Sequence, residues 1–235
     1  MSIHNARFVA TVLVAMVFPL TSALADTIAV DNPSFETLPP GGLTIACSDP
    51  SGGCRYSSGA IPGWSTSLSS GTSGQFQPGP PTNTTYYNTV PDGITIAYID
   101  GVGTISQVVL PAVQLGVTYT LNVDLGFDKP PTAAFDGEAD LLVNGVRYPA
   151  IGIPPSRGNW SNYTATYLGL AADVGQSITI ELVSSGTEGA FDNVRLTDSV
   201  TSVPEPSSAL LFLLPALFVL VRRRTGAAAG QPVRR

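Results

Sequence analysis

The feature of this chain that most limits its fold is the near absence of helical periodicity between frequent glycines and prolines. The 235 residues include 24 glycines and 20 prolines, and the runs between them are rich in β-branched and aromatic residues, which favour strands. Thr118–Leu125 alternates cleanly, with Tyr119, Leu121, Val123 and Leu125 forming an apolar face. We therefore expect strands rather than helices throughout the central part of the chain.

Short alternating segments of this kind recur along the chain. The segments expected to be strands are Thr27–Val30, Gly93–Tyr98, Thr104–Leu110, Thr118–Leu125, Ala139–Val143, Val146–Tyr148, Tyr163–Leu168, Ser177–Val183 and Phe191–Leu196. Asn144-Gly145 lies between two of them and is a strong signal for a type I′ hairpin. Many short strands with turns between them predict an all-β fold, an antiparallel β-sandwich.

Three stretches are expected to be long loops. They are Leu38–Ser73, which is rich in Gly, Ser and Pro, Gln75–Asp92, and Asp128–Glu138. Long loops on a rigid scaffold are where binding usually takes place. Cys47 and Cys54 lie in the first loop, and in an exported chain we expect them to form a structural disulfide.

The charge of the central region excludes one class of function. Asp26–Val203 carries five basic residues against sixteen acidic ones, a net charge of −11. Nucleic-acid binding needs a basic surface, so it is disfavoured. An acidic surface fits a soluble extracellular protein or one that binds divalent cations.

The catalytic side chains available to the chain are few. The only histidine is His4, in the N-terminal segment, so histidine-based nucleophilic, acid–base and metal chemistry is excluded from the mature protein. Lys129 is the only lysine and precedes two prolines. Only carboxylates remain, and we expect a protein that is not an enzyme. The alternative is a glycan hydrolase that uses Asp136 and Glu138, which with Asp140 form the densest carboxylate cluster.

The N-terminus has the three parts of a secretory signal peptide. Arg7 supplies a basic region, Phe8–Leu20 is apolar, and Ala23-Leu24-Ala25 is a small-x-small cleavage site. We expect residues 1–25 to be removed and the mature protein to begin near Asp26.

The C-terminus carries a polar motif, an apolar run and a basic cluster in that order. Val203-Pro204-Glu205-Pro206 precedes the apolar run Ala209–Val221, and Arg222-Arg223-Arg224 follows it. The run is about 13 residues, roughly 20 Å as a helix, which spans a bilayer only marginally. The arginines are expected to stay on the cytoplasmic side. An ordinary single-pass anchor and a transient sorting signal are both open on these grounds.

This tail resembles the PEP-CTERM sorting domain. The resemblance implies recognition by an exosortase, cleavage near the motif, transient residence in the inner membrane, and a Gram-negative host that makes extracellular polysaccharide. The expected organisation is a signal peptide (1–25), a β-sandwich (26–199), a linker with the motif (200–206), a hydrophobic segment with the arginines (207–224) and a cytoplasmic tail (225–235).

The sandwich itself carries a second resemblance. Val30–Glu36 opens it, Ala190–Leu196 closes it, and Ile61–Trp64, Ile105–Gln107 and Gly116–Leu121 follow in order between them. This order resembles the galactose-binding-like jelly rolls, which include many carbohydrate-binding modules. The resemblance implies a structural calcium held by Glu36 and Asp192, to which Asp31 adds a ligand. The alternative is two strand-capping carboxylates without metal. Apart from this calcium, no cofactor is expected.

Aromatic residues in or near the loops are the candidates for glycan stacking. They are Tyr86, Tyr87 and Trp160, with Phe76 as a weaker one, whereas Trp64 in Pro-Gly-Trp is expected in the core. The strand residues Tyr98, Tyr119 and Tyr167 are expected to be structural.

The function expected from the sequence is that of an exported protein of the cell envelope, cell surface or extracellular matrix. It binds polysaccharide without catalysis in this interpretation. The alternative is a calcium-stabilised structural protein of the surface or matrix without specific glycan binding.

Overall fold

The computed structural model describes residues 25–48, 53–79, 85–130 and 134–200. The expected signal peptide, apart from Ala25, the sorting motif Val203–Pro206 and the arginines 222–224 lie outside these residues. Within the described ranges no helix is long and apolar enough to cross a membrane.

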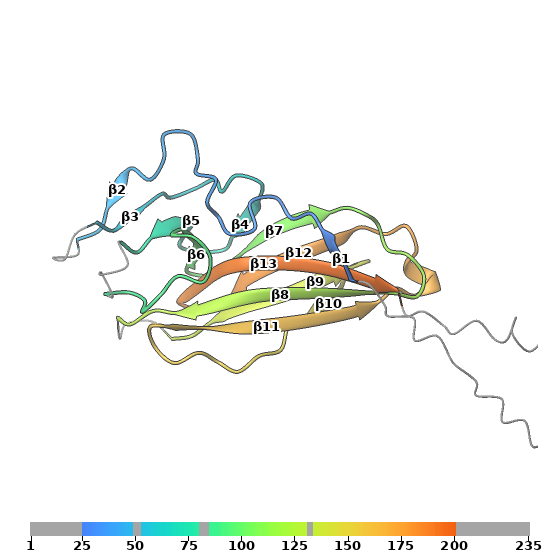
Figure 1. Ribbon diagram of the computed structural model, residues 1–235. Helices are drawn as coiled ribbons and strands as arrows, with labels where there is room; N and C mark the ends of the chain where they lie inside the picture. The colour runs from blue at the N-terminus through green and yellow to red at the C-terminus, as the bar shows by residue number, and fades with distance from the viewer. Residues whose placement is uncertain (1–24, 49–52, 80–84, 131–133, 201–235) are drawn as a thin grey trace, which may run out of the picture. The chain divides into compact units, whose positions relative to one another are not determined.

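Most of the strands belong to a twisted eight-stranded sheet (Figure 1). Its path is β11-β8-β13-β6-β5-β3-β2, and β1 pairs with β13 beside that path. The bounds are β1 Ala25–Ile28, β2 Ile45–Ala46, β3 Arg55–Tyr56, β5 Thr72–Gln77, β6 Ile96–Asp100, β8 Val117–Phe127, β11 Asn159–Leu168 and β13 Glu188–Val200.

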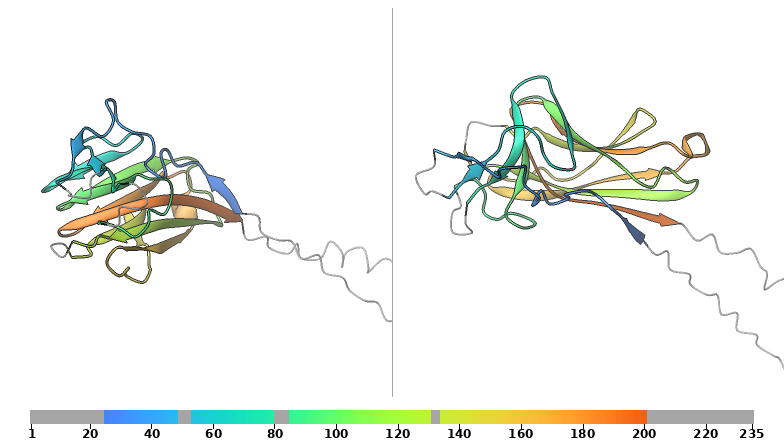
Figure 2. Two further views of the ribbon diagram at one scale, coloured as in Figure 1. Left: turned by 60° about the vertical axis from the view of Figure 1, so that its left-hand side comes forward. Right: turned by 90° about the horizontal axis from the view of Figure 1, so that it is seen from above.

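A five-stranded sheet forms the second layer, in the order β10-β9-β12-β7-β4. The bounds are β4 Ser65–Leu68, β7 Gly103–Val109, β9 Gly137–Val143, β10 Val146–Pro149 and β12 Ile178–Ser184, and one short 3-10 helix, η1, spans Ala171–Asp173. The central strand pairs β11–β8 and β13–β8 of one sheet, and β12–β7 and β12–β9 of the other, are antiparallel. Figure 2 shows the two layers facing each other. The predicted all-β antiparallel sandwich is confirmed.

The core lies between the two sheets and follows the alternation in the sequence. In β8 the predicted apolar face, Tyr119, Leu121, Val123 and Leu125, is fully buried. Ile178, Ile180 and Leu182 on β12 are buried equally deeply and belong to the same core. Each such side chain contributes about 1.5–3 kcal/mol through removal from water, which fixes the register of both sheets.

The hairpin and one core prediction are also confirmed. Asn144 and Gly145 both have positive φ, at 50° and 77°, as a type I′ turn between β9 and β10 requires. Trp64 is buried, packs its ring 5.5 Å from that of Phe35 and donates its indole N–H to the carbonyl of Asn32.

The interpretation of 38–73 and 75–92 as loops is partly wrong, because β2, β3, β4 and β5 lie within them. β5 reads Thr-Ser-Gly-Gln-Phe-Gln, without the apolar alternation of a strand. It nevertheless pairs with both β3 and β6, and Ser73, Gly74 and Gln75 are buried there. Gly74 is required, since a Cβ at this position would lie 2.0 Å from the carbonyl oxygen of Ser57.

A smaller apolar cluster lies outside the main core and supports one end of the eight-stranded sheet. Its buried members are Tyr87, Ile96 and Ala190. Phe76, Tyr86, Val90 and Trp160 pack around them. In Figure 1, β2, β3 and β5 with their loops gather at this end of the sandwich.

Candidate functional site

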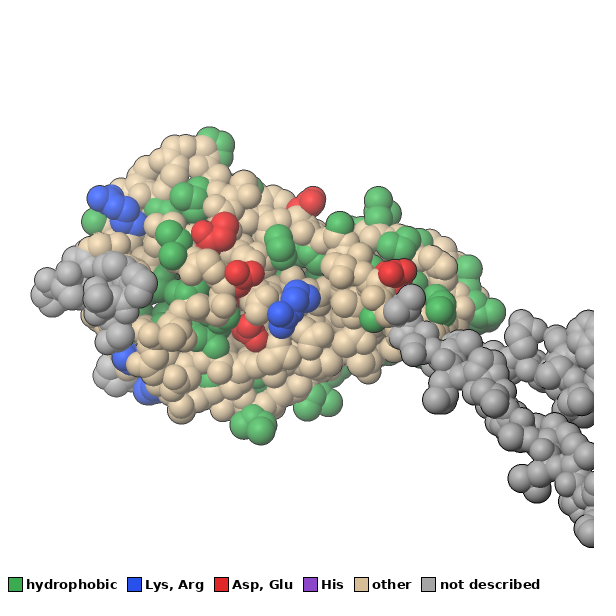
Figure 3. Space-filling model, viewed as in Figure 1, with side chains coloured by type: hydrophobic (Ala, Val, Ile, Leu, Met, Phe, Trp, Pro, Cys, Tyr) green, Lys and Arg blue, Asp and Glu red, His purple; other side chains and the backbone are tan. Residues whose placement is uncertain are grey.

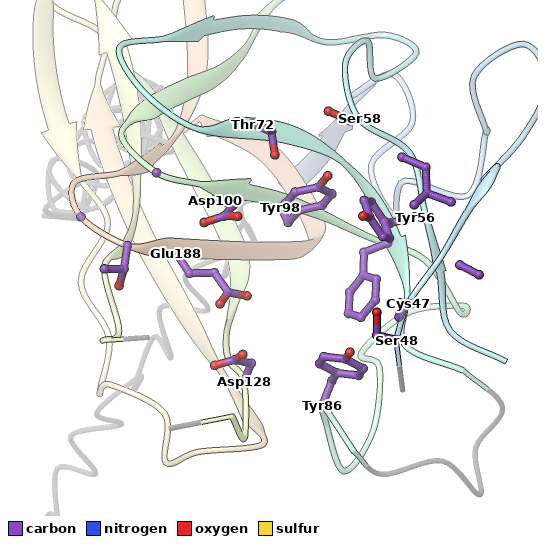
Figure 4. A pocket seen from close by; sticks show the side chains of 16 residues that line it. Cys47, Ser48, Tyr56, Ser58, Thr72, Tyr86, Tyr98, Asp100, Asp128 and Glu188 are labelled. Atoms are coloured by element: carbon purple, nitrogen blue, oxygen red, sulfur yellow. The ribbon is translucent and has the colours of Figure 1, made fainter. Parts of the chain in front are cut away.

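A pocket of about 1150 Å³ opens at this end of the eight-stranded sheet. Its walls come from segments far apart in the sequence: the loop after β2, the strands β3, β5 and β6, the turn after β8, and the start of β13. Figure 4 shows side chains from these elements converging on one space. Figure 3 shows one face of the molecule, on which charged side chains are few and scattered.

Three carboxyls line the pocket in a row across neighbouring strands. Glu188 at the start of β13 pairs directly with Asp100 at the end of β6. On the other side, Ala190 pairs with Gly126, and continuing this register places Asp128 opposite Glu188. Asp128 and Glu188 point toward each other in Figure 4. The antiparallel register thus gathers Asp100, Asp128 and Glu188, which are 28 and 60 residues apart along the chain.

This row keeps one of the carboxyls protonated at neutral pH. Burial, and after it the negative charge of Asp128, raise the pKa of Glu188 to about 8; a hydrogen bond to Asp128 and the charge of Asp100 act in the same direction. Burial also raises the pKa of Asp128, whereas the hydrogen bond from Glu188 and the charge of Arg157 lower it. Glu188 is therefore an acid with a proton to give.

The turn that carries Glu188 is held by Asp136. The Oδ2 atom of Asp136 accepts hydrogen bonds from the backbone N–H of Thr187, at 2.7 Å, and from its hydroxyl, at 3.0 Å. The carbonyl of Asp136 accepts the N–H of Ser185, and the carbonyl of Thr187 accepts the N–H of Gly101. These bonds hold the residue before Glu188 against the segment before β9 on one side and the turn after β6 on the other.

Aromatic rings form the wall opposite the carboxyls. Tyr56 meets Tyr98 edge-on at 6.4 Å, and Phe76 meets Tyr86 edge-on at 5.1 Å. All four line the pocket. Tyr98, expected to be structural, donates its hydroxyl to the carbonyl of Ser57 at 2.8 Å, and it also lines the pocket. Tyr119 and Tyr167 are core residues, as predicted.

Of the three residues predicted to stack on glycan, one lines the pocket and two do not. Tyr86 is half-buried and lines the pocket. Tyr87 is only 3% exposed, so its expected role as a stacking surface is wrong: its ring packs 4.9 Å from that of Trp160 inside the smaller cluster. Trp160 covers Gly126 and donates its N–H to the carbonyl of Thr89, outside the pocket lining.

The expected calcium ligands are occupied by hydrogen-bond donors. Glu36 accepts the N–H groups of Ile94 and Thr95, and Asp192 accepts the N–H of Asp92 and of Asn193. Calcium instead requires six to eight converging oxygens, and within the described residues no group of three metal-binding side chains occurs. In this structure Glu36 and Asp192 hold residues 92–95 in place by accepting hydrogen bonds from their backbone N–H groups. Calcium bound with Asp31 as a further ligand stays a prediction.

The carboxylates of the hydrolase alternative do not share one cleft. Asp136 holds the turn before Glu188, and Glu138 is exposed. Asp140 forms an ion pair with Arg147, which also contacts Glu181 on the five-stranded sheet. The disulfide Cys47–Cys54 is confirmed, and Cys47 lies in the pocket wall.

Sequence reasoning missed Glu188, Asp128 and Asp100 as site residues. Each stands alone in the sequence at the end of an apolar strand, as in Gly126-Phe127-Asp128 and Glu188-Gly189-Ala190. The sequence does show a carboxyl at the end of each apolar strand. It does not show the strand order that brings the three carboxyls together.

The comparison that decides the family covers the whole sandwich. The model of the HpiC1-like family, described as HpiC1 cyclase, matches residues 26–197. The chain belongs to the HpiC1-like family. No curated protein sequence matches it.

The chain is also similar to solved structures. An apo cyclase from Fischerella sp. is 21% identical, with a TM-score of 0.59 over 74% of this chain and 96% of that one. TmCBM61 in complex with β-1,4-galactotriose is 16% identical, with a TM-score of 0.40 over 72% and 97%. The CBM22-2 xylan-binding domain of Paenibacillus barcinonensis Xyn10C is 13% identical, with a TM-score of 0.39 over 59% and 93%.

These matches correct the expectation that the chain is not an enzyme. The family is a cyclase family, and the structure at a TM-score of 0.59 is a cyclase. The expectation failed because it rested on the absence of histidine from the mature chain and considered only one carboxylate cluster, that of Asp136, Glu138 and Asp140. A carboxyl with a raised pKa outside that cluster was not considered.

Proposed function

We propose that this chain is a cyclase that starts ring closure by donating a proton from Glu188 to a neutral, largely apolar substrate. The observation that carries the proposal is a pocket carboxyl with a pKa raised to about 8, facing an aromatic wall, in a chain of a cyclase family. General acids are most effective when their pKa lies near the working pH.

The reaction balances with the residues present. The Glu188 O–H bond breaks as the proton adds to a carbon–carbon double bond or a carbonyl oxygen of the substrate. A nucleophilic group of the same substrate then closes on the cation. The new Glu188 carboxylate takes a proton back from the ring product, so the net change is an isomerisation.

The rest of the pocket is suited to stabilising the cation. Asp128 and Asp100 line the pocket, so that their negative charge would lie beside the cation. The rings of Tyr56, Phe76 and Tyr98 present π surfaces, which attract cations by about 0.5–2 kcal/mol each.

The test uses two neutral probes that cyclise by isomerisation under acid: 2-(3-methylbut-2-enyl)phenol, which closes to a chroman, and citronellal, which closes to isopulegol. We expect turnover of at least one probe by residues 26–200, and a loss of about 100-fold or more in Glu188→Gln, as for other general acids. Glu138→Gln, at an exposed site on β9, is the matched control. Equal turnover by wild type and Glu188→Gln would contradict the proposal.

Polysaccharide is the second candidate ligand. It is supported by half-buried rings, Tyr56 and Tyr86, beside the hydroxyls of Ser48, Ser58 and Thr72 in the pocket wall. Sugar rings stack on aromatic faces while hydroxyls hydrogen-bond. Retardation of the domain in gels containing galactan or xylan, lost in Tyr86→Ala, is the expected result. Unretarded migration in both gels would remove this candidate.

We also propose export and exosortase sorting, on the sequence of the two termini alone. Expression in a Gram-negative host with and without an exosortase gene tests it by mass spectrometry. We expect a mature protein that begins near residue 26 in both hosts and ends near residues 203–206 only with the enzyme. The same C-terminus in both hosts would refute the sorting step.

A further inference from the structure

The turn after β8, which carries Asp128, is bound to one guanidinium group. Nη1 of Arg157 donates to the carbonyl of Pro130 at 2.7 Å and lies 3.9 Å from Oδ1 of Asp128. The guanidinium carbon lies 4.3 Å from the centre of the Phe127 ring. Arg157 thus contacts both sides of Asp128 along the chain as well as its carboxylate.

The sheet register places Arg157 there. Asn159 at the start of β11 pairs with Phe127 at the end of β8, and the N–H of Gly158 donates to the carbonyl of Phe127 at 2.6 Å. Gly158 has φ +78°, which turns the chain just before β11. The residue before it therefore projects over the turn that follows β8.

The two facing carboxyls differ in their surroundings. Asp128 is 7% exposed, and its Oδ1 has no hydrogen-bond partner among the described residues, with Arg157 as the cation beside it. Glu188 instead lies between two carboxyls, Asp128 and its cross-strand partner Asp100. Like charges directly opposite each other on neighbouring strands are destabilising, so ionising Glu188 costs more than ionising Asp128.

We propose that Arg157 is a positioning residue that keeps Asp128 ionised, so that the proton shared by the two carboxyls stays on Glu188 and points into the pocket. The proposal rests on the function proposed for Glu188 and says why that carboxyl, rather than Asp128, is the acid. Without the guanidinium, Asp128 would compete with Glu188 for the proton, and the proton would then lie between the two carboxyls rather than point into the pocket.

The charged and titratable groups around Asp128 agree with this assignment. Glu188 on β13 lies opposite Asp128, Asp100 on β6 lies beyond Glu188, Lys129 follows Asp128 in the chain, and Arg157 lies before β11. From the loop before β6, Tyr87 has a pKa raised well above its usual value, by burial first and then by Glu188 and Asp128. Arg157 lies 3.9 Å from the carboxylate of Asp128 and lowers its pKa.

The test is a carbon-13 NMR titration of the side-chain carboxyls in residues 26–200, with Asp128→Asn used to assign the Asp128 signal. In Arg157→Gln we expect the Asp128 midpoint to rise by about one pH unit, since a charge about 4 Å away is partly screened by solvent. Arg157→Lys keeps the charge but not the fork of contacts, so the midpoint should rise by less. Arg147→Gln, an ion-paired arginine on the other sheet, should leave it unchanged.

An unchanged Asp128 midpoint in Arg157→Gln overturns the proposal, and so does an equal rise in Arg147→Gln. If Arg157→Gln does not fold, Arg157→Lys decides, because a midpoint identical to wild type then contradicts a positioning role. Probe turnover is measured on the same samples. A normal midpoint shift without turnover in wild type refutes acid catalysis and leaves the role of Arg157 standing.

Discussion

The acid role proposed for Glu188 depends on its raised pKa, and this gives the first prediction. The active form is the protonated one, so turnover of an acid-sensitive probe should be constant below about pH 7 and fall as the pH rises through about 8. The measurement is the pH profile of kcat/KM. A profile that instead falls near pH 4.5, the ordinary value for Glu, would show that Glu188 is not the acid.

A second prediction concerns the buried hydroxyl of Tyr87. It has no hydrogen-bond partner among the described residues, and a buried polar group without a partner costs about 1–3 kcal/mol. We expect Tyr87→Phe to leave the free energy of unfolding unchanged or to raise it by about 1 kcal/mol. Urea denaturation checks this, with Tyr98→Phe as the comparison, since Tyr98 loses a 2.8 Å bond to Ser57 and should be destabilised. A clear loss of stability in Tyr87→Phe would mean that this hydroxyl has a partner.

At the scale of elements, the turn before β13 depends on one carboxylate. Asp136→Ala removes two hydrogen bonds to Thr187, which should cost about 1–3 kcal/mol and let Glu188 move from its place beside Asp128. We expect probe turnover to fall more than stability alone explains. Glu138→Ala, two residues along and exposed, is the control. Equal turnover in the two variants at a temperature where both are folded would contradict this role.

The disulfide should stabilise one wall of the pocket locally. Cys47 and Cys54 close a loop with a sequence separation of 7, for which the loop-entropy estimate is about 2.5 kcal/mol as an upper value. We expect Cys47→Ser/Cys54→Ser to lose up to this amount and to increase hydrogen exchange in β2 and β3. Unchanged exchange there would show that pairing with β5 alone holds the wall.

Some strands can be predicted from the sequence and others cannot. The core strands β8 and β12 can be predicted from alternation, because one face of each strand is buried and the other is more exposed. β5 cannot, since its interior positions are Ser73, Gly74 and Gln75, which are buried without being apolar. The backbone and side-chain N–H groups of Gln75 donate hydrogen bonds to Ser57 and Thr37, and neither contact is visible in the sequence. The row Asp100, Glu188 and Asp128 depends on which strands are neighbours, a property of the whole sheet. These three residues were therefore missed as a candidate site.

For the whole molecule, two carboxyls with strongly raised pKa values, those of buried Asp192 and half-buried Glu188, contribute most to the dependence of stability on pH. Burial raises the pKa of Asp192 to about 8, as for Glu188, although two backbone N–H bonds oppose the shift. Between about pH 4 and pH 8 the folded state therefore holds protons that the unfolded state has released. Stability is highest at the acid end of this window and falls as the pH rises, by up to about 1.4 kcal/mol per unit for each group.

Thermal melts in a chelator should show this fall, and Asp192→Asn should make it shallower. Calcium bound beside Glu36 and Asp192 would hold Asp192 ionised, so addition of calcium should flatten the curve if that sequence-based prediction is correct. A melting temperature that rises from pH 5 to pH 8 in chelator would contradict the assignment of raised pKa values.

The most direct test of the central claim is the protonation state of Glu188 in the wild-type domain. A carbon-13 NMR titration, with Glu188→Gln to assign the signal, reports it without any substrate. We expect the Glu188 carboxyl to titrate with a midpoint near 8, so that it is largely protonated at pH 7. A midpoint near 4.5 would leave the pocket without a proton donor and contradict the proposed acid-initiated cyclisation.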